Sequence, residues 1–252
     1  MLKVRVIPIL TFNGFGLVKT KKFSNPRMVG NPVQAARVYN ARGVDELIFL
    51  DIKASDQSRK INLTLVRDII NECFMPVGIG GGIDSLDDIN DLLKIGADKI
   101  VVKSKAIKNP GFVTEASLFF GRQCISVAVD AFWTESGYKV YNNIGADLNV
   151  IDFTKQMRDK GAGEIVITSV DNDGMMKGFD THLVSMIEEV VSLPLIAVGG
   201  GGELSHYREL FAKTKVEAVG SASIFHFTQH TSLDIKTEIS KLGRPVRRVE
   251  TY

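Results

Sequence analysis

The segment Pro76-Val77-Gly78-Ile79-Gly80-Gly81-Gly82 recurs in outline as Pro194-Leu195-Ile196-Ala197-Val198-Gly199-Gly200. Residues 43–48 and 161–166 repeat at the same offset. Similarity at one fixed offset indicates a chain made of two similar halves, about 1–120 and 121–240. A ligand bound between two such halves is expected to have two similar ends.

Short runs rich in β-branched residues recur along the whole chain and are expected to be strands. They cover residues 4–10, 46–51, 76–81, 99–104, 125–131, 164–170, 194–200 and 218–222. The segments between them have helical apolar spacing, as at Leu86 and Ile89, and Gly43, Gly96 and Gly161 stand where left-handed helix caps are expected. Eight strands alternating with helices predict an α/β fold, a (β/α)8 TIM barrel with a half-barrel internal repeat. A doubly wound open sheet is the alternative, but it usually needs fewer strands or a second domain.

The composition describes one large domain without a marked charge preference. The 252 residues are 44% apolar and carry a net charge of +2, so a single core over 1–252 is expected, with no partner among nucleic acids or membranes. Cys73 and Cys124 lack metal-ligand spacing, so no disulfide framework, metal site or other cofactor is expected. No run reaches the ~18 apolar residues of a membrane span, which favours a cytoplasmic protein.

Glycines and serines follow four of the expected strands. Chemistry in a parallel barrel belongs at the C-terminal ends of the strands, where glycine turns let backbone N–H groups approach an anion. The segments 80–82 and 199–202, together with Ser104, Ser221 and Ser223, therefore predict two phosphate-binding turns. The simpler alternative is that these glycines serve tight turns alone.

Carboxylates also end strands or follow them, at Asp51, at Asp130 and in the loop Asp171-Asn172-Asp173-Gly174. Asp130 is the best candidate for acid–base catalysis, the alternative being a cap on the following loop. The repeat places Thr11 opposite Asp130. A threonine hydroxyl cannot shuttle protons near neutral pH as a carboxylate can.

Charged residues begin several strands at the opposite, lower mouth of the predicted barrel. Arginine, lysine and two glutamates there could meet across the barrel axis as an alternating ion-pair ring, formed by Arg5, Glu46, Lys99 and Glu164. The usual interpretation of charge at this mouth is stability or a solvated rim.

Over essentially its whole length the chain resembles the cyclase subunit of imidazole glycerol phosphate synthase. The motifs that carry this resemblance are Arg5-Val6-Ile7-Pro8, Phe49-Leu50-Asp51-Ile52, Gly80-Gly81-Gly82-Ile83, Gly96-Ala97-Asp98-Lys99, Asp173-Gly174, Gly178-Phe179-Asp180 and Phe225-His226-Phe227. The resemblance implies a half-barrel-duplicated (β/α)8 protein that binds a substrate with two phosphoribosyl ends. It also implies a glutaminase docked on the lower face, from which ammonia crosses the barrel.

The resemblance assigns roles to residues already noted. It makes the ion-pair ring the ammonia gate and Asp98 part of the glutaminase interface. Gly82 and Ser104 match one phosphate site, and the other phosphate site is matched by Gly174, Gly200, Ala222 and Ser223. Contacts to the substrate are expected from Lys19, Asp51, Thr168 and Asp173. Lys103 stands where the family usually has asparagine.

One departure concerns the chemistry itself. The family's cyclase reaction resembles acid–base catalysis by two aspartates, one at the position of Asp130 and one at the position of Thr11. Loss of a positioned acid or base typically forfeits ~10² to 10⁴ in rate. An intact ring with a missing aspartate resembles a paralogous branch found with surface-saccharide biosynthesis. That branch works with a glutaminase and a sugar amidotransferase and supplies ammonia.

Three functions remain open at this point. The favoured one is an ammonia-channelling subunit for amidation of a nucleotide-linked sugar, acetamido to acetamidino. The second is a true lyase/cyclase of histidine biosynthesis that makes imidazole glycerol phosphate and AICAR, with Asp130 performing both proton transfers. The third, a two-phosphate isomerase, has no use for the ring and needs a carboxylate where Thr11 stands.

Overall fold

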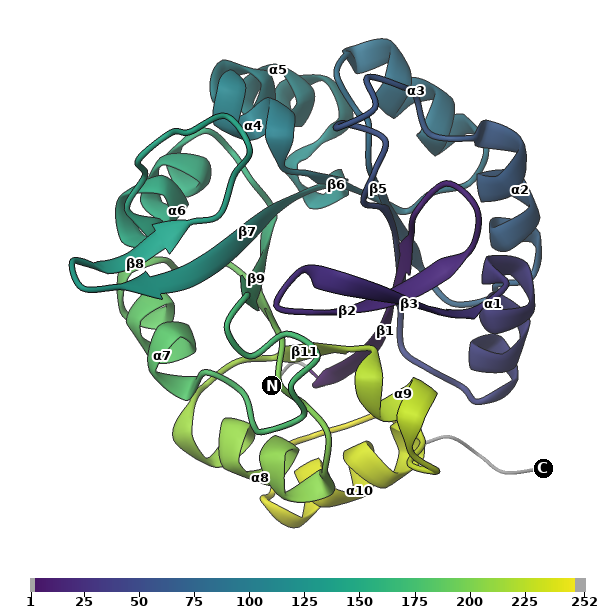
Figure 1. Ribbon diagram of the computed structural model, residues 1–252, viewed down its shortest axis with the longest axis vertical. Coiled ribbons are helices and arrows are strands. Elements are labelled where there is room, and N and C mark those ends of the chain that lie inside the picture. The colour runs from purple at the N-terminus through teal and green to yellow at the C-terminus, as the bar shows by residue number, and fades with distance from the viewer. Residues whose placement is uncertain (1–2, 248–252) are drawn as a thin grey trace.

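The computed structural model describes residues 3–247 as a closed parallel barrel surrounded by helices (Figure 1). The single domain predicted over 1–252 thus includes two short ends outside the described residues. In chain order the barrel strands are β1 (Arg5–Phe12), β4 (Leu47–Asp51), β5 (Val77–Gly80), β6 (Lys99–Val102), β7 (Ile125–Thr134), β9 (Glu164–Ser169), β10 (Leu195–Val198) and β11 (Ala218–Ser221). Each neighbour is parallel, and β11 pairs with β1 to close the ring. The predicted (β/α)8 barrel is confirmed, and the open sheet is excluded.

The helices form the outer layer of the barrel (Figure 1). They are α1 (Pro32–Ala41), α2 (Leu63–Asn71), α3 (Leu86–Lys94), α4 (Ser104–Lys108), α5 (Gly111–Phe120), α6 (Val150–Asp159), α7 (Thr181–Val190), α8 (Leu204–Lys213), α9 (Ser223–Phe227) and α10 (Ser232–Lys241). Helix α3 shows how the sequence specifies them: Ser85 and Asp88 form a capping box, and Ile89 and Leu92 are buried. Gly43, Gly96 and Gly161 have the positive φ expected of helix caps.

The barrel interior is filled by its own small apolar cluster, separate from the larger core between strands and helices. Its members are Ile7, Ile9, Ile48, Val101, Ala128, Val166, Ile196 and Ala218. Gly220 leaves room for this layer, since a Cβ there would lie 2.5 Å from Ile9 Cδ1 and these side chains would have to shift. An apolar layer therefore lies inside the barrel between its two mouths.

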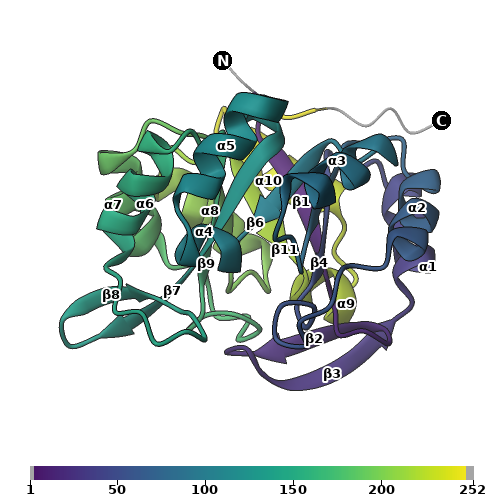
Figure 2. The same cartoon turned by 90° about the horizontal axis from the view of Figure 1, so that it is seen from above.

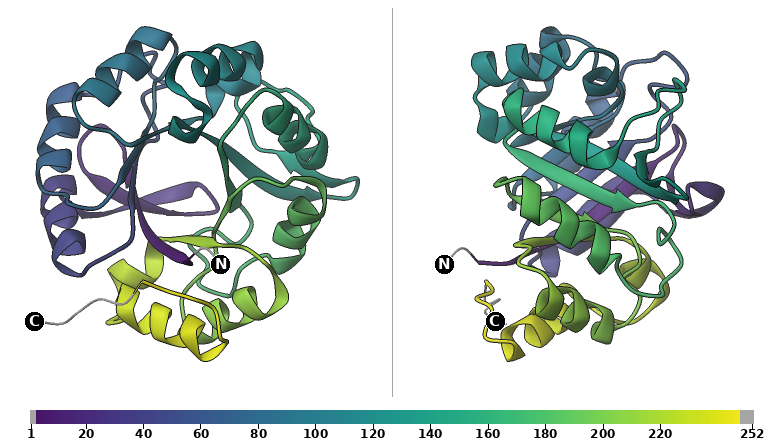
Figure 3. Two further views of the ribbon diagram at one scale, coloured as in Figure 1. Left: turned by 180° about the vertical axis from the view of Figure 1, so that it is seen from behind. Right: turned by 90° about the vertical axis from the view of Figure 1, so that its left-hand side faces the viewer.

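Two hairpins that the strand patterns did not predict extend from the C-terminal ends of β1 and β7. Strands β2 (Leu17–Lys21) and β3 (Ser24–Gly30) form an antiparallel hairpin after β1, and β8 (Gly137–Val140) pairs with β7. Figure 2 and the right panel of Figure 3 show both hairpins on the same side of the molecule. They cover the upper mouth, where the chemistry was expected.

Strands β1 and β7 lie on opposite sides of the barrel. They are separated by β4, β5 and β6 in one direction and by β9, β10 and β11 in the other. Helices α4 and α9, five residues each, follow β6 and β11 at equivalent places in the two halves. This arrangement agrees with a repeat, although the division near residue 120 stays a prediction. Within residues 3–247 no helix has the length and apolar character needed to cross a membrane.

Candidate functional site

The residues expected at the lower mouth meet as a closed ion-pair ring. Arg5 Nη1 donates to Glu46 Oε2 at 2.6 Å, and its other terminal nitrogen donates to Glu164. Lys99 Nζ lies 3.0 Å from Glu46 and 2.9 Å from Glu164, so two cations alternate with two carboxylates. Ser126 Oγ adds a donor to Glu164 at 3.3 Å. The structure thus brings these residues together, and their role as an ammonia gate stays a prediction.

Burial governs the electrostatics of this ring. Glu46 and Glu164 are only 2% and 6% exposed, so their charges require close partners. Burial alone disfavours the charged form of Arg5, but the two glutamates outweigh it and hold the pKa of Arg5 above its ordinary value. The guanidinium is therefore permanently charged.

Asp98 lies exposed on the turn that leads into β6, beside the ring. Its carboxylate accepts a hydrogen bond from the backbone N–H of Val77 at 2.8 Å. Asp98 therefore has a local structural task in addition to the partner contact predicted from the resemblance, which remains a prediction.

At the upper mouth, two of the expected carboxylates are held by several donors. Asp51 accepts two hydrogen bonds from Arg59, at 2.6 and 2.8 Å, and further ones from the backbone N–H groups of Lys53 and Ala54. Asp173 accepts from Lys19 Nζ at 2.7 Å and from Thr20 Oγ1 at 3.1 Å.

Asp130 differs from these two because its side chain is held by a single donor among the described residues. Lys103 Nζ donates to Asp130 Oδ2 at 2.5 Å, from the residue that follows β6. Within residues 3–247 the Asp130 side chain accepts no hydrogen bond from the following loop. The structure therefore does not support the alternative in which Asp130 caps that loop. Thr168, its register partner on β9, is buried beside it.

The Thr11 hydroxyl makes a structural hydrogen bond. Its Oγ1 donates to the backbone carbonyl of Val18 on β2, which ties β1 to the hairpin. The hydroxyl is thereby committed to local structure.

The glycines of the predicted phosphate turns are each required by neighbouring backbone. A Cβ on Gly82 would lie 2.6 Å from the carbonyl oxygen of Arg59, one on Gly174 2.0 Å from that of Thr20, and one on Gly200 1.9 Å from that of Gly178. All three also have positive φ. The tight-turn interpretation therefore explains these glycines by itself, and their phosphate role stays a prediction.

The serine beside the second turn supplies an independent observation. Ser223 Oγ is buried and has no hydrogen-bond partner among residues 3–247. Buried hydroxyls normally have a partner, so this one is free to bind a ligand. Ala222 and Lys103 precede α9 and α4 with similar backbone angles, so Ser223 and Ser104 occupy equivalent positions at the two short helices.

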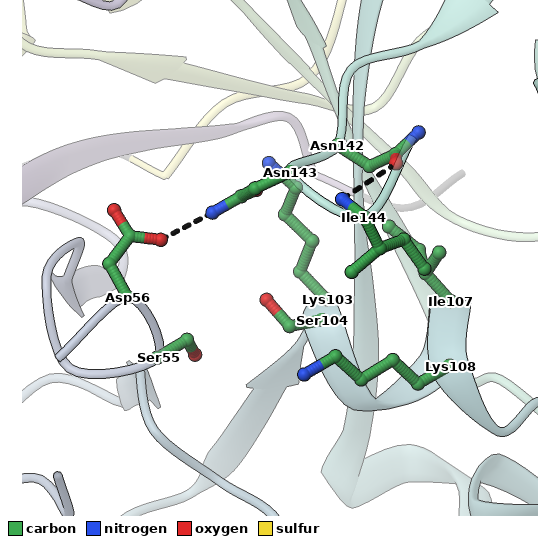
Figure 4. Close-up of a pocket in the computed structure, with 9 residues that line it drawn as sticks. All are labelled: Ser55, Asp56, Lys103, Ser104, Ile107, Lys108, Asn142, Asn143 and Ile144. Carbon is green, nitrogen blue, oxygen red and sulfur yellow. Dashed lines mark hydrogen bonds between the residues drawn. The ribbon is translucent and has the colours of Figure 1, made fainter. Parts of the chain in front are cut away.

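A cavity of about 460 Å³ is lined in part by Lys103, the hydrogen-bond partner of Asp130 (Figure 4). Its walls come from the loop after β4, from α4 and from the loop after β8, and its lining residues are Ser55, Asp56, Lys103, Ser104, Ile107, Lys108, Asn142, Asn143 and Ile144. Asn143 donates to Asp56 across the cavity. A second cavity of about 670 Å³ lies under the β7–β8 hairpin and reaches Lys22 and Tyr141.

Several residues of this mouth were not predicted from the sequence as site residues. Arg59, Lys108, Asn143 and Tyr141 lie in loops or on α4 and carry no motif. Lys103 had one signal, its departure from the asparagine expected there. No group of three or more His, Cys, Asp or Glu side chains within residues 3–247 is arranged to hold a metal ion.

Fold and site together define a (β/α)8 barrel with an ion-pair ring at one mouth and carboxylates with glycine turns at the other. The sequence model of the family described as "Histidine biosynthesis protein" matches residues 5–231, and the chain belongs to this family.

Individual relatives cover the full length. The chain is 43% identical over 252 residues to a protein of Staphylococcus carnosus, covering 98% of this chain and 99% of the relative. It is 41% identical over 252 residues to one of Staphylococcus saprophyticus and 40% over 257 residues to one of Staphylococcus aureus, covering 98% of this chain and 100% of each relative. All three are named imidazole glycerol phosphate synthase subunit HisF. The predicted family is thus confirmed, and these names favour the histidine-biosynthesis interpretation over sugar amidation.

Proposed function

We propose that this chain is the barrel subunit of a glutamine amidotransferase of the imidazole glycerol phosphate synthase type. A glutaminase docks on the lower face, where Asp98 lies exposed, and releases ammonia at the ion-pair ring. The ring carries this proposal. Burying the Glu46 and Glu164 carboxylates costs desolvation free energy, and a barrel end with a purely structural task is closed as well by apolar side chains.

The apolar layer above the ring fits the passage of neutral ammonia. Ammonium would lose its hydration there without a counter-ion, whereas NH₃ loses only hydrogen bonds. Rearrangement of the ring is required for entry, because its ion pairs close the lower mouth. The layer then favours delivery of NH₃ rather than NH₄⁺ to the upper mouth.

At the upper mouth the proposed substrate is a small molecule with a phosphate at each end. Its phosphates bind at the turns of Gly82 with Ser104 and of Gly174, Gly200, Ala222 and Ser223, and the buried Ser223 hydroxyl supports the second site. Lys19, Asp51, Thr168 and Asp173 surround the centre between them. The products are imidazole glycerol phosphate and AICAR, in histidine biosynthesis. The cytoplasmic location expected from the sequence stays a prediction.

A second candidate is favoured by Thr11, whose hydroxyl is committed to Val18, together with the Lys103–Asp130 pair. These features depart from a two-aspartate cyclase. In this candidate the ammonia reaches a sugar amidotransferase, which converts the acetamido group of a nucleotide-linked sugar to an acetamidino group. The names of the relatives support the first candidate.

The proposal is tested by reconstituting the chain with a synthase-family glutaminase and measuring glutamine-dependent and ammonium-dependent turnover separately. Each acceptor is tried in turn: the aminoimidazole ribonucleotide precursor alone, and the nucleotide-linked acetamido sugar with its amidotransferase. We expect the precursor to be converted. Conversion of the sugar alone would establish the second candidate, and no glutamine-dependent product with either acceptor would overturn both.

The gate has its own variant in the same assay. Lys99→Met should lower glutamine-dependent turnover about tenfold or more while ammonium-dependent turnover persists, because ammonium in solution reaches the upper mouth directly. Lys155→Met, on the outer helix α6, is the matched control and should change neither rate. Equal loss of both rates in Lys99→Met would mean that the ring serves only stability.

A further inference from the structure

Lys103 is the cation closest to the candidate catalytic carboxylate. It follows β6 and precedes α4, and its Nζ donates to Asp130 Oδ2 at 2.5 Å. Aromatic rings cover the ammonium from above: that of Tyr141 lies 5.4 Å and that of Phe23 5.8 Å from Nζ. The same side chain lines the cavity shown in Figure 4. Lys103 and Asp130 thus form a contact pair at the edge of a space that a ligand can enter.

The other carboxylates described at this mouth are each held by several donors. Asp51 accepts from Arg59 and two backbone N–H groups, and Asp173 is buried with Lys19 and Thr20. Thr11 donates to Val18. Lys103 and Asp130, by contrast, are joined by one hydrogen bond. Among the described residues, no other donor reaches the Asp130 side chain.

We propose that Lys103 is the proton donor of the ammonia-incorporating step, with Asp130 as the proton acceptor. This inference rests on the first candidate of the proposed function, in which the aminoimidazole ribonucleotide precursor reacts at this mouth. A carbonyl carbon of this acceptor exchanges its oxygen for nitrogen. Lys103 thereby takes over the second acid–base role that Thr11 cannot fill.

The proton balance of this step closes within the pair. The nitrogen lone pair of NH₃ forms a bond to the carbonyl carbon, and Asp130 takes a proton from the nitrogen. Lys103 protonates the carbonyl oxygen to a hydroxyl. The C–O bond then breaks, and this hydroxyl leaves as water by taking a second proton from the nitrogen as C=N forms. Transfer from Asp130 across the short contact restores the Lys103 ammonium. The net change is carbonyl plus ammonia to imine plus water, without an oxidant or reductant.

The surroundings of Lys103 suit a proton donor better than a lysine that only binds an anion. The Lys103 side chain is 25% exposed, and the two aromatic rings limit the access of water to it. Lys108, which lines the same cavity, has no ion-pair partner among residues 3–247 and makes no contact with Asp130. Lys108 is therefore the matched control for a lysine that acts on a bound phosphate alone.

The test uses ammonium chloride as the nitrogen source, without the glutaminase, and the aminoimidazole ribonucleotide precursor as the acceptor. Lys103→Met should lower kcat about 10²-fold or more with a KM change below about threefold. Lys103→Arg keeps the cation beside Asp130, but its guanidinium does not give up a proton in this pH range, so kcat should stay low. Lys108→Met should change KM more than kcat, and Lys155→Met, on the outer helix α6, is the control that should leave both unchanged. Melting curves of all variants check folding.

Other outcomes overturn the inference. A raised KM with unchanged kcat in Lys103→Met makes Lys103 a phosphate anchor, and full recovery of kcat in Lys103→Arg makes it a positioning charge for Asp130. Both contradict proton donation while leaving the proposed function intact. A wild-type chain that does not incorporate ammonia into this precursor overturns the first candidate function and this inference together.

Discussion

At the scale of single residues, Thr11 occupies the position at which a two-aspartate mechanism needs its second carboxylate. The Thr11 hydroxyl donates a hydrogen bond to the backbone carbonyl oxygen of Val18. An aspartate at this position has no donor for that bond, and its carboxylate would face the same carbonyl oxygen. We expect Thr11→Asp to lower the free energy of unfolding by about 1–3 kcal/mol, measured by urea denaturation.

The same variant tests the chemistry. Thr11→Asp should raise ammonium-dependent conversion of the aminoimidazole ribonucleotide precursor, because it supplies a second carboxylate opposite Asp130. Thr11→Asn, which has nearly the same shape but no titratable group, is the control. Equal activity of the two variants would contradict the expectation.

His226 gives a pH dependence at the residue scale. Burial, together with the nearby Lys19, holds the pKa of His226 below its ordinary value of 6.5. The unfolded chain therefore takes up the proton first, so the stability contributed by neutral His226 is present above pH 6.5 and is lost as pH falls below that value. Urea denaturation at pH 7.5 and 5.5 should show a larger loss in the wild type than in His226→Gln.

At the scale of elements, two glycines with positive φ separate the effect of close packing from that of backbone conformation. Gly200 has φ +110° and a backbone oxygen where its Cβ would be, whereas Gly30 has φ +145° and open space around it. Gly200→Ala should cost at least ~2 kcal/mol of stability and Gly30→Ala about 1 kcal/mol. Similar losses in the two variants, measured by thermal unfolding, would show that close packing at Gly200 is unimportant.

The β2–β3 hairpin is the element that sequence patterns missed. Strand β3 is almost wholly exposed and β2 is short, so neither shows an extended alternation of apolar and polar residues. Lys22 and Phe23 at its tip have positive φ without being glycine, an unusual turn composition. Phe23 nevertheless packs edge-on against Tyr141 of the opposite half, which brings the two halves together above Lys103.

At the scale of the whole molecule, the two halves predict two anion sites. Ser104 and Ser223 begin equivalent short helices after β6 and β11. Calorimetric titration with inorganic phosphate should therefore give two equivalents bound by the wild type. Ser104→Asp and Ser223→Asp should each leave one, because a carboxylate repels the anion. A wild type that binds one equivalent would contradict paired sites.

The barrel itself could be predicted from the sequence because its signals are local and repeated. Each of the eight strands overlaps a predicted run, α3 has the expected apolar face, and Gly43, Gly96 and Gly161 end helices as expected. These patterns arise wherever a strand or helix must bury one side, so they can be recognised without knowledge of the neighbours.

The candidate site was predictable in its positions and in the ion-pair ring of its lower mouth, but not in the pairings of its upper mouth. The sequence alone determined a closed α/β barrel, its two mouths, and the residues Arg5, Glu46, Lys99, Glu164 and Asp130 at strand ends. Only the tertiary structure decided that Asp130 pairs with Lys103, that Asp51 is held by Arg59 and that Thr11 is bound to Val18. Strand periodicity fixes the face on which a side chain lies, but its partner depends on loop paths and rotamers, which are set by long-range packing.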